Sequence, residues 1–153
     1  MFEFVRLKSE YKKLELDHMC RKDIFPGLIL SLLGGITVII GAVGAHQFRP
    51  KISIEAYDRF ETGFFYQVFH LLVLLLVWSS DKISSRSKTW IYRFMGLGIL
   101  FFSGSLYLVA IRELLVFDLL FLSYIAPFGG LLFISGWLTL AWGIYKKRED
   151  KVG

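Results

Sequence analysis

Four long apolar runs, separated by short polar stretches, dominate the pattern along the chain. They cover about residues 24–45, 62–80, 91–111 and 124–145. An α-helix rises 1.5 Å per residue, so about 20 apolar residues cross the ~30 Å hydrocarbon core of a bilayer. The sequence therefore predicts an all-α protein, an integral membrane bundle of four transmembrane helices within residues 24–145.

The second helix is expected to begin before its apolar run. Ser53 is a good N-cap residue, and Ile54, Tyr57, Phe60 and Phe64 follow it at helical spacing. We therefore expect one helix over about residues 54–80, with its first turns at the lipid surface or against a neighbouring helix.

Polar side chains inside these runs are the candidate functional residues, because lipid offers them no water as a hydrogen-bond partner. On the second helix His70 lies eight residues, about 12 Å, below an outer interface near Thr62, and Ser103 lies equally deep on the third. We expect a hydrogen bond from His70 to Ser103 or Ser105. The predicted polar cluster, which extends outward to the interface, consists of His46, Tyr66, Gln67, His70, Ser103, Ser105 and Tyr107.

Two interpretations of the cluster stay open from the residues alone: it ties the helices together, or it lies on a pathway for a proton or a small solute. Axial ligation of a haem by His46 and His70 is disfavoured, because their depths differ by about 12 Å. The sequence has no Cys-x-x-Cys-His, zinc-type or phosphate-loop motif and no nucleophile elbow. We expect no enzyme activity, no metal and no cofactor.

Small residues recur every seven positions in three of the runs. Such a stripe favours close packing of two helices that cross at about +20°. The stripes predict helix seams but do not distinguish packing within one chain from packing in a homo-oligomer or against a membrane protein partner. The third run has Gly96, Ser103 and Ala110, and the seam residues of the first and fourth runs are Gly27, Ser31, Gly34, Gly41, Gly129, Gly136 and Gly143.

Composition and charge fix the class and the orientation. Hydrophobic residues make up 55% of the chain, which is too apolar for a soluble domain of this size. Of the 18 Lys and Arg residues, fourteen lie on the side of the two termini and four on the other. The positive-inside rule then predicts both termini in the cytoplasm. The net charge of +5 is explained by this topology, so a nucleic-acid partner is not expected, and contact with anionic lipid is a secondary expectation.

The chain outside the spans is short and charged. Residues 1–23 place Phe4, Leu7, Tyr11 and Leu14 at helical spacing among charged residues, which suits either an interfacial amphipathic helix or a partly ordered tail with no role. Residues 146–153 form a basic cytoplasmic tail. The first run is longer than the ~7 to 15 residues of a signal-peptide core, so we expect it to be retained.

Several of these motifs together resemble a known family. They are Gly41-Ala-Val-Gly-Ala-His46, Phe60-Glu-Thr-Gly63 with Tyr66, Gln67 and His70, Ser103-Gly-Ser-Leu-Tyr107, and Pro127-Phe-Gly-Gly130 with Gly136-Trp137. From about Leu28 to Trp142 the chain resembles the domain-of-unknown-function 423 family, which is similar to transmembrane protein 256. The resemblance implies a small four-span membrane protein, usually bacterial, with no established activity.

The expected function is therefore that of a non-enzymatic protein of the bacterial plasma membrane, in which the cluster around His70 pins the bundle or binds a small ligand. One alternative is a carrier or permeation subunit for a proton or small solute. Another is an assembly or accessory subunit that holds a membrane partner through its glycine seam.

Overall fold

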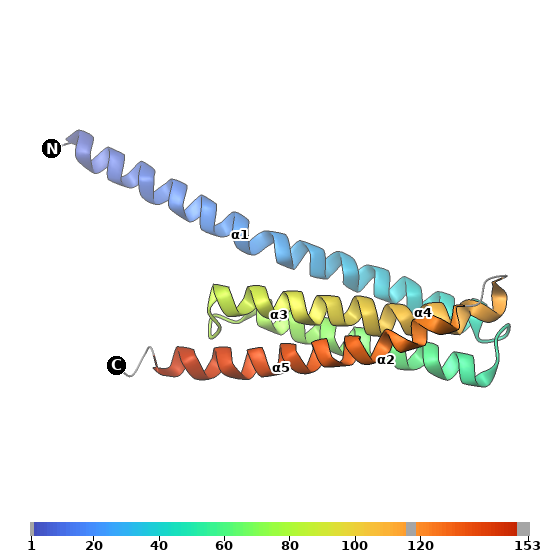
Figure 1. Cartoon of the computed structure of the whole chain (residues 1–153). Helices are drawn as coiled ribbons and strands as arrows, with labels where there is room; N and C mark the ends of the chain where they lie inside the picture. The colour runs from blue at the N-terminus through green and yellow to red at the C-terminus, as the bar shows by residue number, and fades with distance from the viewer. Residues whose placement is uncertain (1, 116–118, 150–153) are drawn as a thin grey trace.

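The chain folds into a bundle of long helices (Figure 1). The computed structural model describes residues 2–115 and 119–149, and no strand occurs in these two ranges. The elements in chain order are α1 (Phe2–Val43), the π-helix η1 (Gly44–Phe48), α2 (Ile54–Ser79), α3 (Ser85–Gly98), the π-helix η2 (Ile99–Ser103), α4 (Gly104–Ile111), the 3-10 helices η3 (Arg112–Leu114) and η4 (Leu120–Tyr124), and α5 (Ala126–Glu149).

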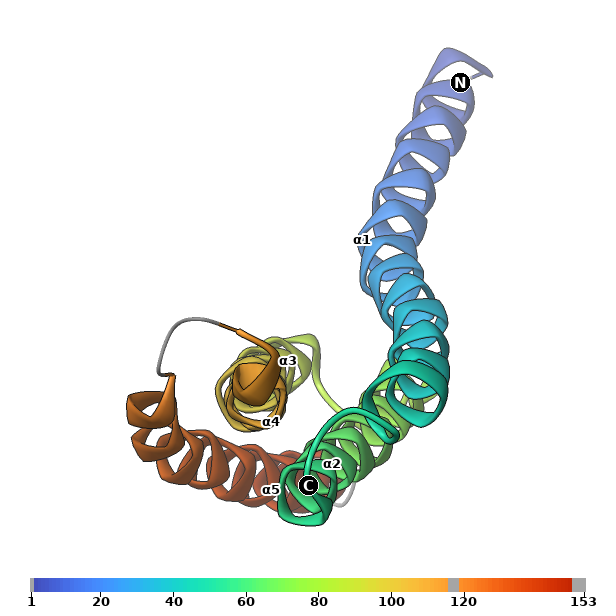
Figure 2. The same ribbon diagram turned by 90° about the vertical axis from the view of Figure 1, so that its right-hand side faces the viewer.

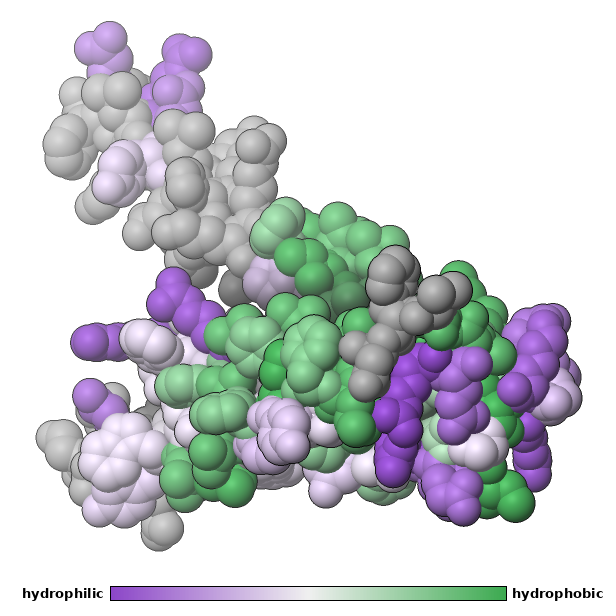
Figure 3. All heavy atoms as spheres, turned by 45° about the vertical axis from the view of Figure 1, so that its right-hand side comes forward, coloured by the Kyte–Doolittle hydropathy of each residue, from purple (hydrophilic) through white to green (hydrophobic). Residues whose placement is uncertain are grey.

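Four of the helical segments are long and apolar enough to cross a membrane, which confirms the predicted fold class. They are Ile24–Phe48, Ile54–Ser79, Ser85–Leu114 and Leu120–Lys146. Figure 3 shows a hydrophobic belt over the middle of the molecule, with hydrophilic residues gathered beyond it at both ends. The third span is one continuous rod in which η2 joins α3 to α4.

The spans are arranged as an open arc (Figure 2). The third span packs against both α2 and α5, whereas α1 lies on the outer side of α2. Both chain ends lie at the same end of the bundle, together with the α2–α3 turn (Figure 1). The assignment of this end to the cytoplasm stays a prediction from the charge distribution.

The seam of α1 packs against α2 of the same chain. A Cβ atom at Gly41 would lie 2.8 Å from the Phe64 ring, and one at Gly27 would lie 2.5 Å from the Trp78 indole. Glycine at these positions therefore makes room for a large side chain of the neighbouring helix. The matched residues repeat every seven positions in opposite directions along the two helices: Gly27 with Trp78, Gly34 with Leu71 and Gly41 with Phe64.

The seam of α5 packs in the same manner against the third span. The three pairs are Gly129 with Phe102, Gly136 with Met95 and Gly143 with Ser87. Gly129 makes the tightest contact, because a Cβ atom there would collide with the backbone nitrogen of Phe102. The expected stripe on the third span is only partly correct, since Gly96 is exposed and an added Cβ would meet nothing within 4 Å.

Ser53 caps α2, as the sequence predicts, by accepting a hydrogen bond from the Ala56 backbone N–H at 3.2 Å. The structure adds a contact that the sequence did not indicate. The Ser53 backbone N–H and Oγ–H each donate to a carboxylate oxygen of Glu113 at 2.7 Å. Because Glu113 lies in η3, these two bonds join the start of α2 to the last turn of the third span.

The N-terminal extension is helical and continuous with the first span in α1 (Figure 1). A helix that lies along the membrane surface would require a bend between the extension and the span. Pro26 lies at that junction, and proline is the residue that most often permits such a bend. The position of the extension relative to the membrane stays a prediction.

Two adjacent glycines provide a matched test of this packing. We expect Gly129→Ala to lower the free energy of unfolding by about 1–3 kcal/mol, because the added methyl group overpacks the contact with Phe102. Gly130→Ala is the control, since its Cβ would meet nothing within 4 Å and alanine is the better helix former. Thermal unfolding in detergent measures both, and equal melting temperatures would contradict the seam between α5 and the third span.

Candidate functional site

The buried polar residues of α2, Gln67 and His70, bond to different neighbouring helices. Gln67 is 7% exposed and joins three helices. Its Nε2 donates to Thr37 Oγ1 of α1 at 2.6 Å, and its Oε1 accepts from the Tyr107 hydroxyl of α4 at 3.0 Å. The Thr37 hydroxyl in turn donates to the Leu33 carbonyl at 2.7 Å. Both ends of the buried amide are therefore satisfied by protein groups.

Thr37 was missed by the sequence analysis. It is 5% exposed and lies inside an otherwise apolar segment. A hydroxyl group in an apolar run is a sign of a possible buried hydrogen bond. In a helix, however, a threonine hydroxyl can also donate to the backbone carbonyl four residues earlier, as Thr37 does here, so it needs no partner on another helix. Its second role as an acceptor for Gln67 depends on how α1 meets α2.

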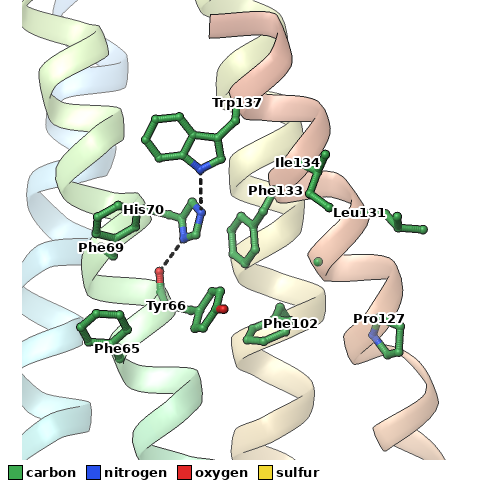
Figure 4. A pocket seen from close by; sticks show the side chains of 11 residues that line it. Phe65, Tyr66, Phe69, His70, Phe102, Pro127, Leu131, Phe133, Ile134 and Trp137 are labelled. Atoms are coloured by element: carbon green, nitrogen blue, oxygen red, sulfur yellow. Dashed lines mark hydrogen bonds between the residues drawn. The ribbon is translucent and has the colours of Figure 1, made fainter. Parts of the chain in front are cut away.

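One turn further along α2, His70 contacts α5 and is 3% exposed (Figure 4). The Trp137 Nε1–H donates to His70 Nε2 at 3.3 Å, so Nδ1 carries the proton and donates to the Tyr66 carbonyl at 2.8 Å. The ring stacks on Phe133 with centroids 3.6 Å apart and planes 12° apart. His70 is thus a neutral, fully hydrogen-bonded side chain that fixes the positions of two aromatic residues of α5.

The predicted hydrogen bond from His70 to Ser103 or Ser105 is wrong. The Ser105 hydroxyl donates to the Phe102 carbonyl at 2.9 Å, and the buried Ser103 hydroxyl has no hydrogen-bond partner within the part of the chain that is described. Ser103 lies level with Gly63, whose added Cβ would be 3.2 Å from the Ser103 carbonyl oxygen. That position is seven residues from His70, or about 10 Å along α2, so the depths predicted from the apolar runs do not match.

His46 does not join the cluster either. It lies in η1 with its side chain exposed, and it makes no hydrogen bond to the other cluster residues that the structure describes. Tyr66 and Phe102 pack ring on ring with centroids 4.5 Å apart, on the His70 side. Among the side chains that the structure describes, no group of three His, Cys, Asp or Glu residues is placed to hold a metal ion.

A cavity of about 500 Å³ lies between α2 and α5, next to His70 (Figure 4). The third span packs against both helices and contributes Phe102 to the wall of the cavity. Most of the lining is apolar, and its aromatic members are Phe65, Tyr66, Phe69, Phe102, Phe133 and Trp137. A volume of this size accommodates a small molecule of a few fused or substituted rings.

Two features inside the cavity suit it to a ligand. The Tyr66 hydroxyl makes no hydrogen bond to a described residue, and the Tyr66 side chain is 39% exposed. Gly130 also lines the cavity, and a Cβ atom at this position would meet nothing within 4 Å. The cavity therefore combines flat apolar walls, one hydroxyl group and unfilled space on the α5 side.

A double-mutant cycle tests the hydrogen bond between Gln67 and Tyr107. We expect Tyr107→Phe to lower the free energy of unfolding in detergent. In a Gln67→Met background the same substitution should cost about 0.6 kcal/mol less, and at most about 1.7 kcal/mol less, because the hydrogen bond is already lost. Tyr124→Phe serves as control because Tyr124 is exposed. A coupling energy of zero would show that the bond does not stabilise the bundle.

Comparison with known proteins bears out the resemblance seen in the sequence. The family described as "Protein of unknown function (DUF423)" matches residues 40–130. The chain is 35% identical to the UPF0382 membrane protein of Staphylococcus saprophyticus over 120 residues, which cover 78% of this chain and 96% of the relative. It is 34% identical over 126 residues to a UPF0382 membrane protein of Haemophilus influenzae, covering 79% and 94% of the two chains.

A third relative is named for its location. The UPF0382 inner membrane protein YgdD of Escherichia coli is 32% identical over 126 residues, which cover 80% of this chain and 91% of the relative. No solved structure matches the chain significantly. Together with the four apolar helices, these matches show that the chain belongs to the DUF423 family and is a multi-pass protein of the bacterial plasma membrane.

Proposed function

We propose that this protein is a non-enzymatic membrane protein that binds a planar, lipid-soluble small molecule in the cavity between α2 and α5. The observation that carries the proposal is the cavity itself, about 500 Å³ in volume and walled by aromatic rings from three helices. Aromatic side chains offer flat faces for stacking, and ring pairs of this kind contribute about 0.5–1.5 kcal/mol each beyond the area that they bury.

The polar groups define which molecule fits best. Tyr66 supplies a hydroxyl that donates to an acceptor such as a carbonyl oxygen, and most of the other lining side chains are apolar. A ligand with a planar ring and one or two carbonyl groups satisfies both requirements. Such molecules dissolve in the hydrocarbon core of the membrane, from which they reach a cavity lying between two transmembrane helices.

His70 has a positioning role in this proposal. Its Nε2 holds the Trp137 indole, and its ring face holds Phe133, so two walls of the cavity depend on one side chain. This role combines the two functions expected from the sequence, because the same contacts pin α5 to α2 and shape the cavity.

The two alternative functions fit these contacts less well. A carrier for protons or polar solutes would need a ring nitrogen of His70 free for exchange, but both nitrogens are bonded to protein groups. The ring is also enclosed by four aromatic neighbours, Tyr66, Phe69, Phe133 and Trp137. An accessory subunit that binds its partner through the glycine seams would need those glycines unoccupied. In this chain, side chains of α2 and the third span lie against them.

Filling the cavity tests the proposal. Menadione, a planar apolar diketone, is the probe, and we expect it to raise the melting temperature of the detergent-solubilised protein because it binds only the folded state. Gly130→Leu should abolish this shift, since the leucine side chain occupies the open space.

Gly35→Leu is the matched control. Gly35 is an exposed glycine of α1 where an added Cβ also meets nothing within 4 Å, and it lies outside the cavity. This variant should keep the full menadione shift. The proposal fails if menadione leaves the wild-type melting temperature unchanged, or if Gly130→Leu and Gly35→Leu respond alike.

A further inference from the structure

A second cavity, of about 410 Å³, lies between the start of α3 and the last turns of α5. This end of the bundle is opposite to the end that carries η1 and η3. The lining of the second cavity differs in kind from that of the first cavity. It includes two cations, Arg86 and Lys146, and two indole rings, Trp90 and Trp142. It also has three hydroxyl groups, those of Ser84, Ser87 and Thr139. None of its lining residues is acidic.

No carboxylate that the structure describes neutralises the two cations. Neither Arg86 nor Lys146 forms an ion pair with a carboxylate whose side chain is described, and both side chains are exposed. They come from different helices and converge on one cavity, α3 supplying Arg86 and α5 supplying Lys146. Nearby Lys88 is engaged differently, since its Nζ donates to the Trp78 carbonyl at 3.0 Å.

The local backbone adds to this positive potential. Ser84 caps the 14-residue helix α3, and the first N–H groups of a helix carry partial positive charge directed outward from its N-terminus. Gly143 allows close approach of the two helices here, because a Cβ atom at this position would lie 3.0 Å from Ser87 Cβ. The cavity is thus a converging set of positive groups and hydroxyl donors, which suits a phosphate group.

The tryptophans indicate where that phosphate comes from. Trp90 and Trp142 are exposed, and tryptophan is enriched at the level of lipid headgroups, where its ring faces the acyl chains and its N–H faces the polar layer. Cations close to this level attract anionic lipids, with a contribution that corresponds to roughly a five-fold gain in affinity for each residue.

We propose that this cavity binds the phosphate group of an anionic phospholipid in the leaflet on the side of the two chain ends. Arg86 and Lys146 contact the phosphate, and one hydroxyl of the hydrogen-bonded pair Ser84 and Ser87 donates to it. The glycerol and upper acyl chains lie along Trp90 and Trp142. This site is independent of the cavity next to His70, from which it differs in location and in chemistry.

Native mass spectrometry of the whole protein in detergent, titrated with phosphatidylglycerol, tests the proposal. We expect one saturable phosphatidylglycerol site that phosphatidylcholine fills much more weakly. The double variant Arg86→Gln with Lys146→Gln should weaken phosphatidylglycerol binding about thirty-fold. Both positions are exposed, so the variant should keep the wild-type melting temperature without lipid.

The double variant Lys51→Gln with Lys82→Gln removes the same charge outside the cavity and should bind phosphatidylglycerol as the wild type does. Equal weakening by both double variants would overturn the site in favour of a general charge effect. Binding of inorganic phosphate as tight as that of phosphatidylglycerol would overturn its assignment to a lipid. Equal affinity for phosphatidylcholine would overturn its selectivity for an anionic headgroup.

Discussion

The contact of a large side chain with a glycine on the facing helix is the interaction on which the rest of this structure depends. Apolar side chains gain little from leaving lipid for another apolar surface, so helices in a bilayer associate largely through close packing. Two such seams occur, one between α1 and α2 and one between α5 and the third span. Each joins neighbouring spans, and α2 then meets the third span at Gly63.

The cavity next to His70 follows from this arrangement. Gly129 and Gly98 draw α5 against the third span, since Gly98 lies under the Phe133 ring. The backbone of α5 therefore stays away from α2, and only long side chains cross the gap. The hydrogen bond from Trp137 to His70 is one of these crossings, and the stack of Phe133 on His70 is another. The remaining space between α2 and α5 is the cavity, and aromatic side chains line it because they are long enough to reach across the gap.

The sequence predicted where the helices lie along the chain, but it did not predict which faces of the helices meet. Length and hydropathy located the four spans, and Ser53 marked the start of α2 because capping is a local interaction. The seven-residue glycine repeats located both seams, since a repeat along one helix reports its own contact face. The family resemblance added the same four-span architecture.

The partners of the buried polar residues could not be derived in this way. Depth was counted from the ends of apolar runs, but the run ends of two helices need not lie at one height. In addition, the π-helix η2, which ends at Ser103, alters the helical repeat there. His70 therefore accepts a hydrogen bond from Trp137 of α5 and does not bond to Ser103. The cavity was equally hidden, because its walls come from residues about 70 positions apart that no local pattern connects.

A cysteine cross-link measures the central claim most directly, namely that the glycine seams pack within one chain. In a Cys20→Ser background, which removes the single native cysteine, Gly34→Cys and Leu71→Cys face each other across the seam between α1 and α2. A short bismaleimide added to the protein in native membranes should yield an intramolecular product that migrates as a monomer. Leu71→Cys alone should remain unlinked. A product of dimer size from the double variant, with no intramolecular link, would show that the seam joins two chains and would contradict this account.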